Sequence, residues 1–169
     1  MDDLFTYAGA GRRPTTILLD YQCTLVANGA DRIIWRACYG RSLPYTDWIA
    51  QEVYRTWLVD LLEASGCSVV LITARPEIYE DATLARIRAE LGWQPDEWYF
   101  NRWAMVPPAC KRRILHERIY PRHGAPDRTG YLALESNAAT RAMYRREGIH
   151  AVRVPETEPW TALPFIPEA

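Results

Sequence analysis

Four polar side chains of this 169-residue chain have the types, and the order along the chain, that phosphoryl transfer requires. Asp20, Thr73 and Glu135 each lie at the end of a short apolar run, and Lys111 lies between Thr73 and Glu135. A carboxylate can attack phosphorus, while a hydroxyl and an ammonium can hold phosphate oxygens. A second carboxylate can complete a Mg²⁺ site that offsets the repulsion between nucleophile and phosphate. Together these side chains predict a phosphoryl-transfer site.

Lys111 is the only lysine among the 20 basic residues of the chain. Its compact ammonium suits the role of a point charge against a phosphate better than a planar guanidinium does. A simpler interpretation stays open, in which the Lys-Arg-Arg run at 111–113 is a solvated helix face. Taken one at a time, Asp20, Thr73 and Glu135 could likewise be ordinary capping residues.

The elements that must position these residues alternate between strands and helices. Apolar runs predict strands at 15–19, 68–72, 97–100, 131–134 and 150–154. Helical periodicity predicts helices at 47–64, 111–119 and 138–147, and a further helix that contains Leu84, Ile87 and Leu91 and ends at Gly92. We expect Thr46 to cap the helix at 47–64 and Gly66 to follow its end. Such alternation predicts a parallel sheet with both faces covered, whose ligands bind outside the carboxyl ends of the strands.

Composition and charge indicate one globular domain. We interpret 1–14 as a lead-in, 15–154 as the α/β domain and 155–169 as a Pro-rich tail. The formal net charge of −1 argues against bulk coating of nucleic acid. No apolar run reaches membrane-spanning length, and the four scattered cysteines favour reduced thiols, so we expect a cytoplasmic protein. The sequence leaves the oligomeric state open.

The four chemical residues also carry a family resemblance. The segment Leu18-Leu19-Asp20-Tyr21-Gln22-Cys23-Thr24-Leu25 resembles the first motif of the haloacid dehalogenase-like (HAD) superfamily, usually D-x-D-x-T-L. Leu71-Ile72-Thr73-Ala74-Arg75-Pro76 resembles the second motif, Lys111 the third, and Leu134-Glu135-Ser136-Asn137 the fourth, usually an acidic pair. The resemblance implies a three-layer Rossmann-like α/β fold around a central parallel sheet. The short interval between the first two motifs leaves room for little or no cap.

The resemblance also assigns roles to these residues. Asp20 is the implied nucleophile, which forms an aspartyl-phosphate, and Thr73 and Lys111 are the implied ligands of the phosphoryl oxygens. Mg²⁺ is the implied cofactor, held by Asp20, by the main-chain carbonyl of Gln22 and by Glu135. The implied reaction is that of a phosphatase or phosphotransferase.

Within the superfamily the chain is most similar to the phosphatase domain of polynucleotide kinases. Thr73-Ala74-Arg75, Phe100-Asn101-Arg102 and the segment 143–149 resemble the T-G-R, M-R and W-R-x-x-G-[IL] segments of that group. This similarity implies a phosphorylated nucleotide or nucleic-acid end as substrate, with Arg75 and Arg102 contacting its phosphates. The chain lacks the G-x-x-x-x-G-K-[ST] motif of a kinase half.

Two departures from the family pattern bear on activity. Gln22 stands where the family has its general acid/base, and Gln cannot transfer a proton, a function worth roughly 10²–10⁴-fold in rate. Ser136 stands where a second acidic residue is expected. The alternative hypothesis is therefore a catalytically silent HAD-like fold kept as a binding or interaction protein. A haloacid dehalogenase, which also lacks the second aspartate, ranks below both because those enzymes usually carry a helical cap.

Overall fold

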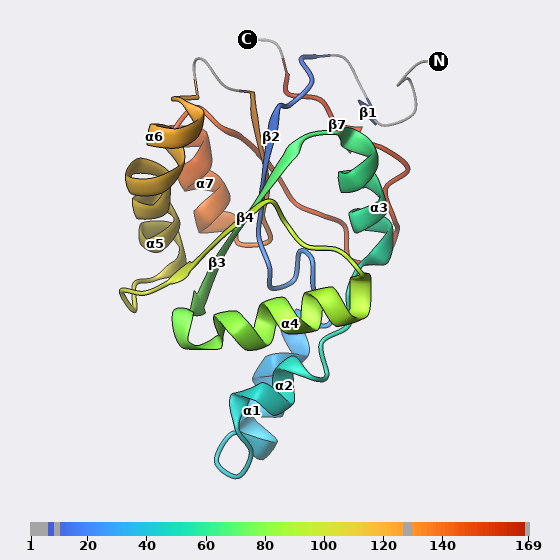
Figure 1. Ribbon diagram of the computed structural model, residues 1–169, viewed down its shortest axis with the longest axis vertical. Coiled ribbons are helices and arrows are strands. Elements are labelled where there is room, and N and C mark those ends of the chain that lie inside the picture. Colours follow the sequence, from blue (N-terminus) through green and yellow to red (C-terminus); the bar gives the residue numbers. More distant parts are fainter. Residues whose placement is uncertain (1–6, 9–10, 127–129, 168–169) are drawn as a thin grey trace.

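Five parallel strands form the central sheet of this computed structural model, which describes residues 7–8, 11–126 and 130–167 (Figure 1). In spatial order the strands are β4 (Glu97–Asn101), β3 (Ser68–Pro76), β2 (Thr16–Leu19), β5 (Tyr131–Leu134) and β6 (His150–Val152). The predicted α/β architecture with a central parallel sheet is confirmed. Every side chain of β2 and β5 is buried, as expected for central strands covered on both faces.

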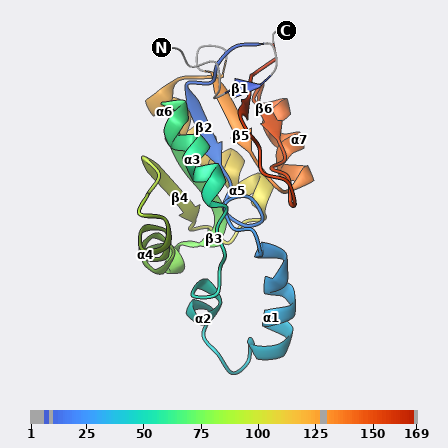
Figure 2. The ribbon, with the colours of Figure 1, turned by 90° about the vertical axis from the view of Figure 1, so that its right-hand side faces the viewer.

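Helices cover both faces of the sheet and make three layers (Figures 1 and 2). Ile17 and Leu19 of β2 pack with the helices α3 (Thr56–Ser65) and α4 (Glu80–Leu91) in one core. Leu18, which points the opposite way, belongs to a second core, since strand side chains alternate between faces. The helical layer of the second core comprises α5 (Pro107–Ile114), the π-helical turn η3 (Leu115–Ile119), α6 (Tyr120–His123) and α7 (Ala138–Arg146).

The segments that flank the predicted domain pair with each other. Strand β1 (Tyr7–Ala8) runs parallel to β7 (Leu163–Pro164), and a further bridge joins Arg12 to Ile166. The side chain of Leu163 is fully buried in the core on the α3 side. The C-terminal segment therefore packs against the sheet domain. None of the helices in the described part of the chain has the length and apolar character needed to cross a membrane.

Two short helices project beyond the carboxyl end of the sheet (Figure 2). They are α1 (Arg32–Tyr39), which follows the 3₁₀ turn η1 (Gly29–Asp31), and α2 (Tyr45–Ile49). Helix α4 also lies near this end of the sheet, between the sheet and the projection in Figure 1.

The single helix predicted at 47–64 is wrong, because the chain leaves the helical conformation between α2 and α3. Backbone groups in this break pair with the loop that follows β2: the N–H of Ala27 donates to the carbonyl of Val53, and the N–H of Arg55 donates to that of Leu25. These hydrogen bonds replace helical ones. Thr46 lies inside α2 instead of capping a helix, whereas Gly66 does follow the end of α3, with a φ of 66°.

Helix α5 starts earlier than the predicted boundary at Lys111. It begins at Pro107, and proline suits the first turn of a helix because its missing N–H has no partner there. Lys111 therefore lies in the second turn, where its side chain can point inward. Two other predicted boundaries agree with the structure to within a residue. The helix predicted to run to Gly92 corresponds to α4, which ends at Leu91, and the helix predicted at 138–147 corresponds to α7.

Candidate active site

The carboxyl ends of the central strands bring two of the four predicted site residues side by side. Leu19 pairs with Leu71 of β3 on one side and with Leu134 of β5 on the other. Asp20 comes one residue after β2, and its N–H donates to the carbonyl of Leu134. Glu135 comes one residue after β5 and is buried. The two carboxylates therefore lie at the same edge of the sheet.

Lys111 joins these two carboxylates. Its Nζ lies 2.6 Å from Oδ1 of Asp20 and 2.6 Å from Oε2 of Glu135. Its side chain is 2% exposed, so the interpretation of 111–113 as a solvated helix face is wrong for Lys111. Three charged groups thus share one buried cluster of formal charge −1, which is a costly arrangement unless a cation or ligand completes it.

The surroundings change the ionisation of the cluster. Burial alone lowers the pKa of Lys111, but the carboxylates of Asp20 and Glu135 outweigh it and hold the ammonium charged. Burial and the nearby charge of Asp20 raise the pKa of Glu135 to about 7, against the opposing effect of Lys111. Glu135 is therefore a carboxyl that exchanges a proton near neutral pH while Lys111 stays protonated.

The second oxygen of Asp20 faces hydroxyl groups. Oδ2 of Asp20 accepts a hydrogen bond from Oγ1 of Thr24 at 2.9 Å. Oγ of Ser136 lies 2.9 Å from this same Oδ2 and 2.9 Å from the main-chain carbonyl oxygen of Gln22. The single hydroxyl proton of Ser136 can go to only one of these oxygens at a time. Oδ2 of Asp20 and the carbonyl oxygen of Gln22 therefore both face the position that the hydroxyl of Ser136 occupies.

This donor set suits a hard divalent cation. The converging atoms are a carboxylate oxygen of Asp20, the carbonyl oxygen of Gln22 and the hydroxyl of Ser136, with Glu135 nearby, and Mg²⁺ prefers oxygen ligands. Among the described residues, no group of three or more His, Cys, Asp or Glu side chains forms a metal site. A Mg²⁺ ion here would consequently depend on the carbonyl of Gln22 and on water as well as on the two carboxylates.

The loop after Asp20 is held by a buried arginine. Nη1 of Arg55 donates to the carbonyl oxygens of Cys23, Thr24 and Val26, at 3.2, 2.7 and 3.1 Å. Cys23 has a positive φ of 60°. A Cβ placed on Gly29 would lie 2.6 Å from the backbone nitrogen of Cys23, so this close approach requires glycine. These contacts fix the backbone that presents the carbonyl of Gln22.

Gln22 is tied to a second buried network. Its Nε2 donates to Oε1 of Glu52 at 2.9 Å, and Glu52 also accepts from the hydroxyl of Tyr21 at 2.6 Å and forms an ion pair with Arg75. Oε1 of Gln22 is buried without a hydrogen-bond partner among the described residues. Arg75 donates in addition to Oγ1 of Thr83 at 2.8 Å.

Thr73, Arg75 and Arg102 take different positions around the site. Thr73 is buried on β3, next to β2, and its Oγ1 accepts the N–H of Arg75 at 3.1 Å. Arg75 is buried, and its guanidinium is engaged with Glu52. Arg102 is exposed just after β4 and forms an ion pair of 2.5 Å with Glu77. Direct contacts within the cluster thus join Asp20, Lys111 and Glu135, while Arg75 and Arg102 are held by other acidic residues.

Glu52 and Arg55 were missed by the sequence predictions. Both lie in the break between α2 and α3, which the apolar spacing had placed inside one helix. Their burial reverses the predicted pattern, since Glu52 is 2% exposed and Val53, predicted on the apolar face, is 57% exposed. A pair of opposite charges three residues apart is common on solvated helices, so no local signal marked these two residues.

The structure is a three-layer α/β protein with a buried cluster of Asp20, Lys111 and Glu135 at the carboxyl edge of its central sheet. No protein-family model matches the chain. No curated protein matches it either.

Solved structures do share the fold. A chain of a Pnkp1/Rnl/Hen1 complex aligns with a TM-score of 0.58 and 18% identity, over 91% of this chain and 50% of that one. A structure of the Pnkp1/Rnl/Hen1 RNA repair complex aligns with the same TM-score and identity, over 91% and 47%. A hydrolase from Streptococcus pneumoniae TIGR4 aligns with a TM-score of 0.53 and 13% identity, over 83% and 92%.

These alignments concern the fold. The predicted likeness to the HAD superfamily, and to the polynucleotide kinase phosphatase domain within it, is confirmed at that level. The chain spans about half the length of the two repair-complex chains that it matches.

Proposed function

We propose that this protein is a Mg²⁺-dependent phosphatase or phosphotransferase that forms an aspartyl-phosphate at Asp20 and acts on a nucleotide or on the phosphorylated end of a nucleic acid. The observation that carries the proposal is the position of Lys111, whose Nζ lies 2.6 Å from Asp20 and 2.6 Å from Glu135. A buried lysine beside a carboxylate at the carboxyl end of a parallel sheet supports phosphoryl transfer, because the ammonium can meet a phosphoryl oxygen once a cation offsets the negative charge of the cluster.

In the proposed first step, a carboxylate oxygen of Asp20 attacks the phosphorus of a phosphate monoester. The bond between phosphorus and the ester oxygen breaks, and its electron pair leaves with that oxygen. Lys111 neutralises charge on the phosphoryl oxygens, and Thr73 donates a hydrogen bond to them from the neighbouring strand. Asp20, the carbonyl of Gln22 and Glu135 would hold Mg²⁺, which when bound would further neutralise the phosphate charge.

In the proposed second step, water attacks the phosphorus of the aspartyl-phosphate, releases inorganic phosphate and regenerates Asp20. The departing alkoxide of the first step and the attacking water of the second both exchange protons with solvent, because Gln22 has no proton to give or take. This favours an enzyme that holds its phosphoryl group on Asp20 for longer than a member with aspartate at this position.

The proposed substrate class has support from the fold. One of the aligned structures is described as an RNA repair complex. The aligned chain of that complex shares its fold with 91% of this chain. The projection formed by α1 and α2 beyond the carboxyl end of the sheet is small (Figure 2).

Beryllium fluoride, which mimics an aspartyl-phosphate, tests the proposal without a known substrate. The melting temperature is measured with Mg²⁺ and beryllium fluoride together and with each alone. A ligand at 100 times its dissociation constant stabilises by about 2.7 kcal/mol, so wild type should melt several degrees higher with both. Asp20→Asn should show no such shift. An equal shift in both proteins, or none in a folded wild type, would refute the proposal.

The engagement of Gln22 with Glu52 favours a second candidate, a silent HAD-like fold that acts as a binding protein. This candidate predicts no beryllium fluoride shift and a biological effect that Asp20→Asn leaves unchanged. Loss of the effect in Asp20→Asn would rule it out.

A further inference from the structure

A pocket of about 470 Å³ lies where the two-helix projection meets the carboxyl end of β3. Its lining includes Arg32, Trp35 and Arg36 of α1, Tyr45 of α2, and Pro76 and Tyr79 beside the end of β3. We refer to it as the α1–α2 pocket. Its volume falls within the range of small-molecule sites, roughly 300–1,000 Å³.

A short series of contacts connects this pocket to Asp20. The ring of Tyr45 in the pocket wall lies 5.4 Å from the guanidinium carbon of Arg75, which lies 4.4 Å from the ring of Tyr21, the residue after Asp20. The α1–α2 pocket is therefore linked through Arg75 to Tyr21, the residue next to Asp20.

Aromatic side chains give the pocket faces for stacking. The rings of Tyr45 and Tyr79 lie 4.7 Å apart between centroids, at an interplanar angle of 46°. The ring of Trp35 meets that of Tyr45 edge-on, at 6.5 Å. Planar ligands such as nucleobases stack on aromatic walls of this kind.

The pocket wall also contains polar groups without partners. The indole N–H of Trp35 and the hydroxyl of Tyr45 are buried and lack a hydrogen-bond partner among the described residues. An unpaired buried donor is destabilising. Because neither atom is exposed to the pocket, a ligand would pair with them only if the surrounding side chains shift.

Two arginines make the pocket positive. Arg32 and Arg36 are four residues apart on α1, hence on one face of that helix. Within the described residues neither has a carboxylate at ion-pair distance, and no acidic side chain lines the pocket. Two free guanidinium groups beside aromatic faces suit an anionic ligand with a planar group.

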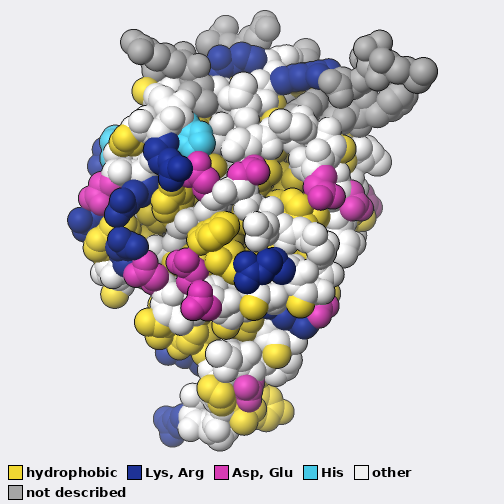
Figure 3. All heavy atoms as spheres, in the orientation of Figure 1, with side chains coloured by type: hydrophobic (Ala, Val, Ile, Leu, Met, Phe, Trp, Pro, Cys, Tyr) yellow, Lys and Arg dark blue, Asp and Glu magenta, His cyan; other side chains and the backbone are white. Residues whose placement is uncertain are grey.

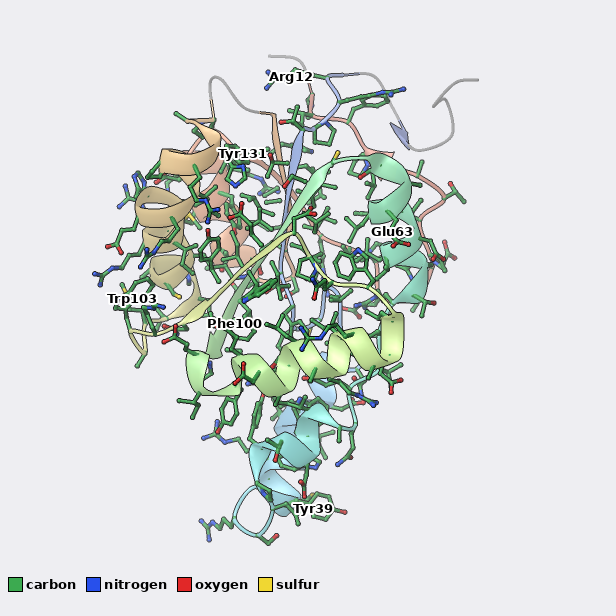
Figure 4. All side chains as sticks on the ribbon, in the orientation of Figure 1. Arg12, Tyr39, Glu63, Phe100, Trp103 and Tyr131 are labelled. Carbon is green, nitrogen blue, oxygen red and sulfur yellow. The ribbon has the colours of Figure 1, made fainter. Side chains whose placement is uncertain are left out.

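A second hollow, of about 550 Å³ beside the edge strand β4, lacks this positive character. Its Arg102 is paired with Glu77, and its Arg122 is paired with Glu97. Basic and acidic side chains are intermixed over the same face in Figure 3. Tyr39, the last residue of α1, lies at the far end of the projection (Figure 4) and does not line the α1–α2 pocket.

We infer that the α1–α2 pocket binds the base and a second phosphate group of a nucleotide whose transferred phosphate lies at Asp20. This inference rests on the proposed function and narrows its substrate class to nucleotides with two phosphate groups, the chemistry found at the phosphorylated end of a nucleic acid. The base stacks on Tyr45 and Tyr79, and the second phosphate pairs with Arg32 and Arg36.

Adenosine 3′,5′-bisphosphate, adenosine 5′-monophosphate and ribose 5-phosphate separate these contributions, since the second lacks a phosphate and the third also lacks a base. Binding is measured with Mg²⁺ in an Asp20→Asn background, which cannot form the acyl-phosphate. The bisphosphate should bind at least about tenfold more tightly than ribose 5-phosphate. The double variant Arg32→Gln/Arg36→Gln should lose about tenfold for the bisphosphate and leave ribose 5-phosphate unchanged.

Two further variants keep the test decisive. Tyr79→Leu should weaken both adenosine compounds and spare ribose 5-phosphate. Arg41→Gln, an exposed arginine outside the pocket, should change none of the three. Equal affinities for the three ligands, or equal losses in the Arg41 and Arg32/Arg36 variants, would overturn the inference.

The beryllium fluoride shift, measured with Asp20 intact, distinguishes this failure from that of the proposed function. The beryllium fluoride shift can be present in wild type and in the Arg32/Arg36 variant while the three ligands bind with equal affinity. That result supports the phosphoryl site and refutes the assignment of the pocket. If the shift is absent in wild type while the bisphosphate still binds through the arginines, the proposed function falls, and with it the pocket's role in substrate binding.

Discussion

The side-chain amide of Gln22 donates a hydrogen bond to Oε1 of Glu52 at 2.9 Å. Glu52 is itself held by the hydroxyl of Tyr21 and by an ion pair with Arg75. The amide nitrogen of Gln22 is therefore engaged with a buried carboxylate and is not free to meet a substrate. The position that supplies a proton in the HAD pattern is here part of the framework that supports the site.

Replacing Gln22 by aspartate tests this view. Gln22→Asp restores a group that can transfer a proton, so hydrolysis of the aspartyl-phosphate should rise by about tenfold or more. The new carboxylate faces Glu52, so the melting temperature should fall at the same time. Phosphate release and thermal unfolding measure the two effects. Gln22→Asn is the matched control, because it shortens the side chain without adding an acid, and an equal rate in both variants would contradict the account.

The ion pair between Glu52 and Arg75 should contribute strongly to stability. Glu52→Gln leaves the buried guanidinium of Arg75 without a counter-charge, which typically costs about 3–5 kcal/mol in the free energy of unfolding. Glu156→Gln, which breaks the exposed ion pair with Arg153, should have a far smaller effect. Denaturant unfolding compares the two variants, and similar losses would show that burial of the Glu52 pair is unimportant.

Lys111 should matter for both folding and binding. Lys111→Met leaves Asp20 and Glu135 buried and facing each other without the ammonium, so we expect a loss of about 3–5 kcal/mol and no beryllium fluoride shift. Arg112→Met, at the exposed neighbouring position, should keep the shift and most of the stability. Retention of the shift in folded Lys111→Met would remove Lys111 from the site.

The raised pKa of Glu135 predicts the pH dependence of the metal-free protein. The folded chain keeps a proton on Glu135 up to a pKa of about 7, whereas an unfolded glutamate loses it near pH 4.3. The folded state therefore binds more protons in this window, and its stability falls as the pH rises from about 4 to 7. Unfolding in EDTA measures the slope, which should be shallower in Glu135→Gln. An unchanged slope would assign the effect to other groups.

The position of Asp20 and Glu135 at one edge of the sheet could be predicted, because parallel strands place their carboxyl ends at the same edge. That the two residues are neighbours follows from the pairing of β2 with β5, which only the structure shows. Lys111 followed from its place in the order of motifs and from being the only lysine. Its burial could not be predicted, since it depends on where α5 begins, and Pro107 moved that start back by one turn.

The framework around the site could not be predicted for a different reason. The spacing of Ile49, Val53, Trp57 and Leu61 fits one helix, and only tertiary hydrogen bonds to the loop after Asp20 break it. Glu52 and Arg55 obtain their roles from those long-range contacts. The two-helix projection and the α1–α2 pocket arise from the same break, and local periodicity contains no information about it.

The central claim is that Asp20 accepts a phosphoryl group. The most direct test treats the protein with acetyl phosphate and Mg²⁺, stops the reaction in acid and locates any modification by mass spectrometry. The account predicts the addition of one phosphoryl group on the peptide that contains Asp20, absent from Asp20→Asn and shorter-lived in Gln22→Asp. No addition in folded wild type, or an addition that persists in Asp20→Asn, would contradict it.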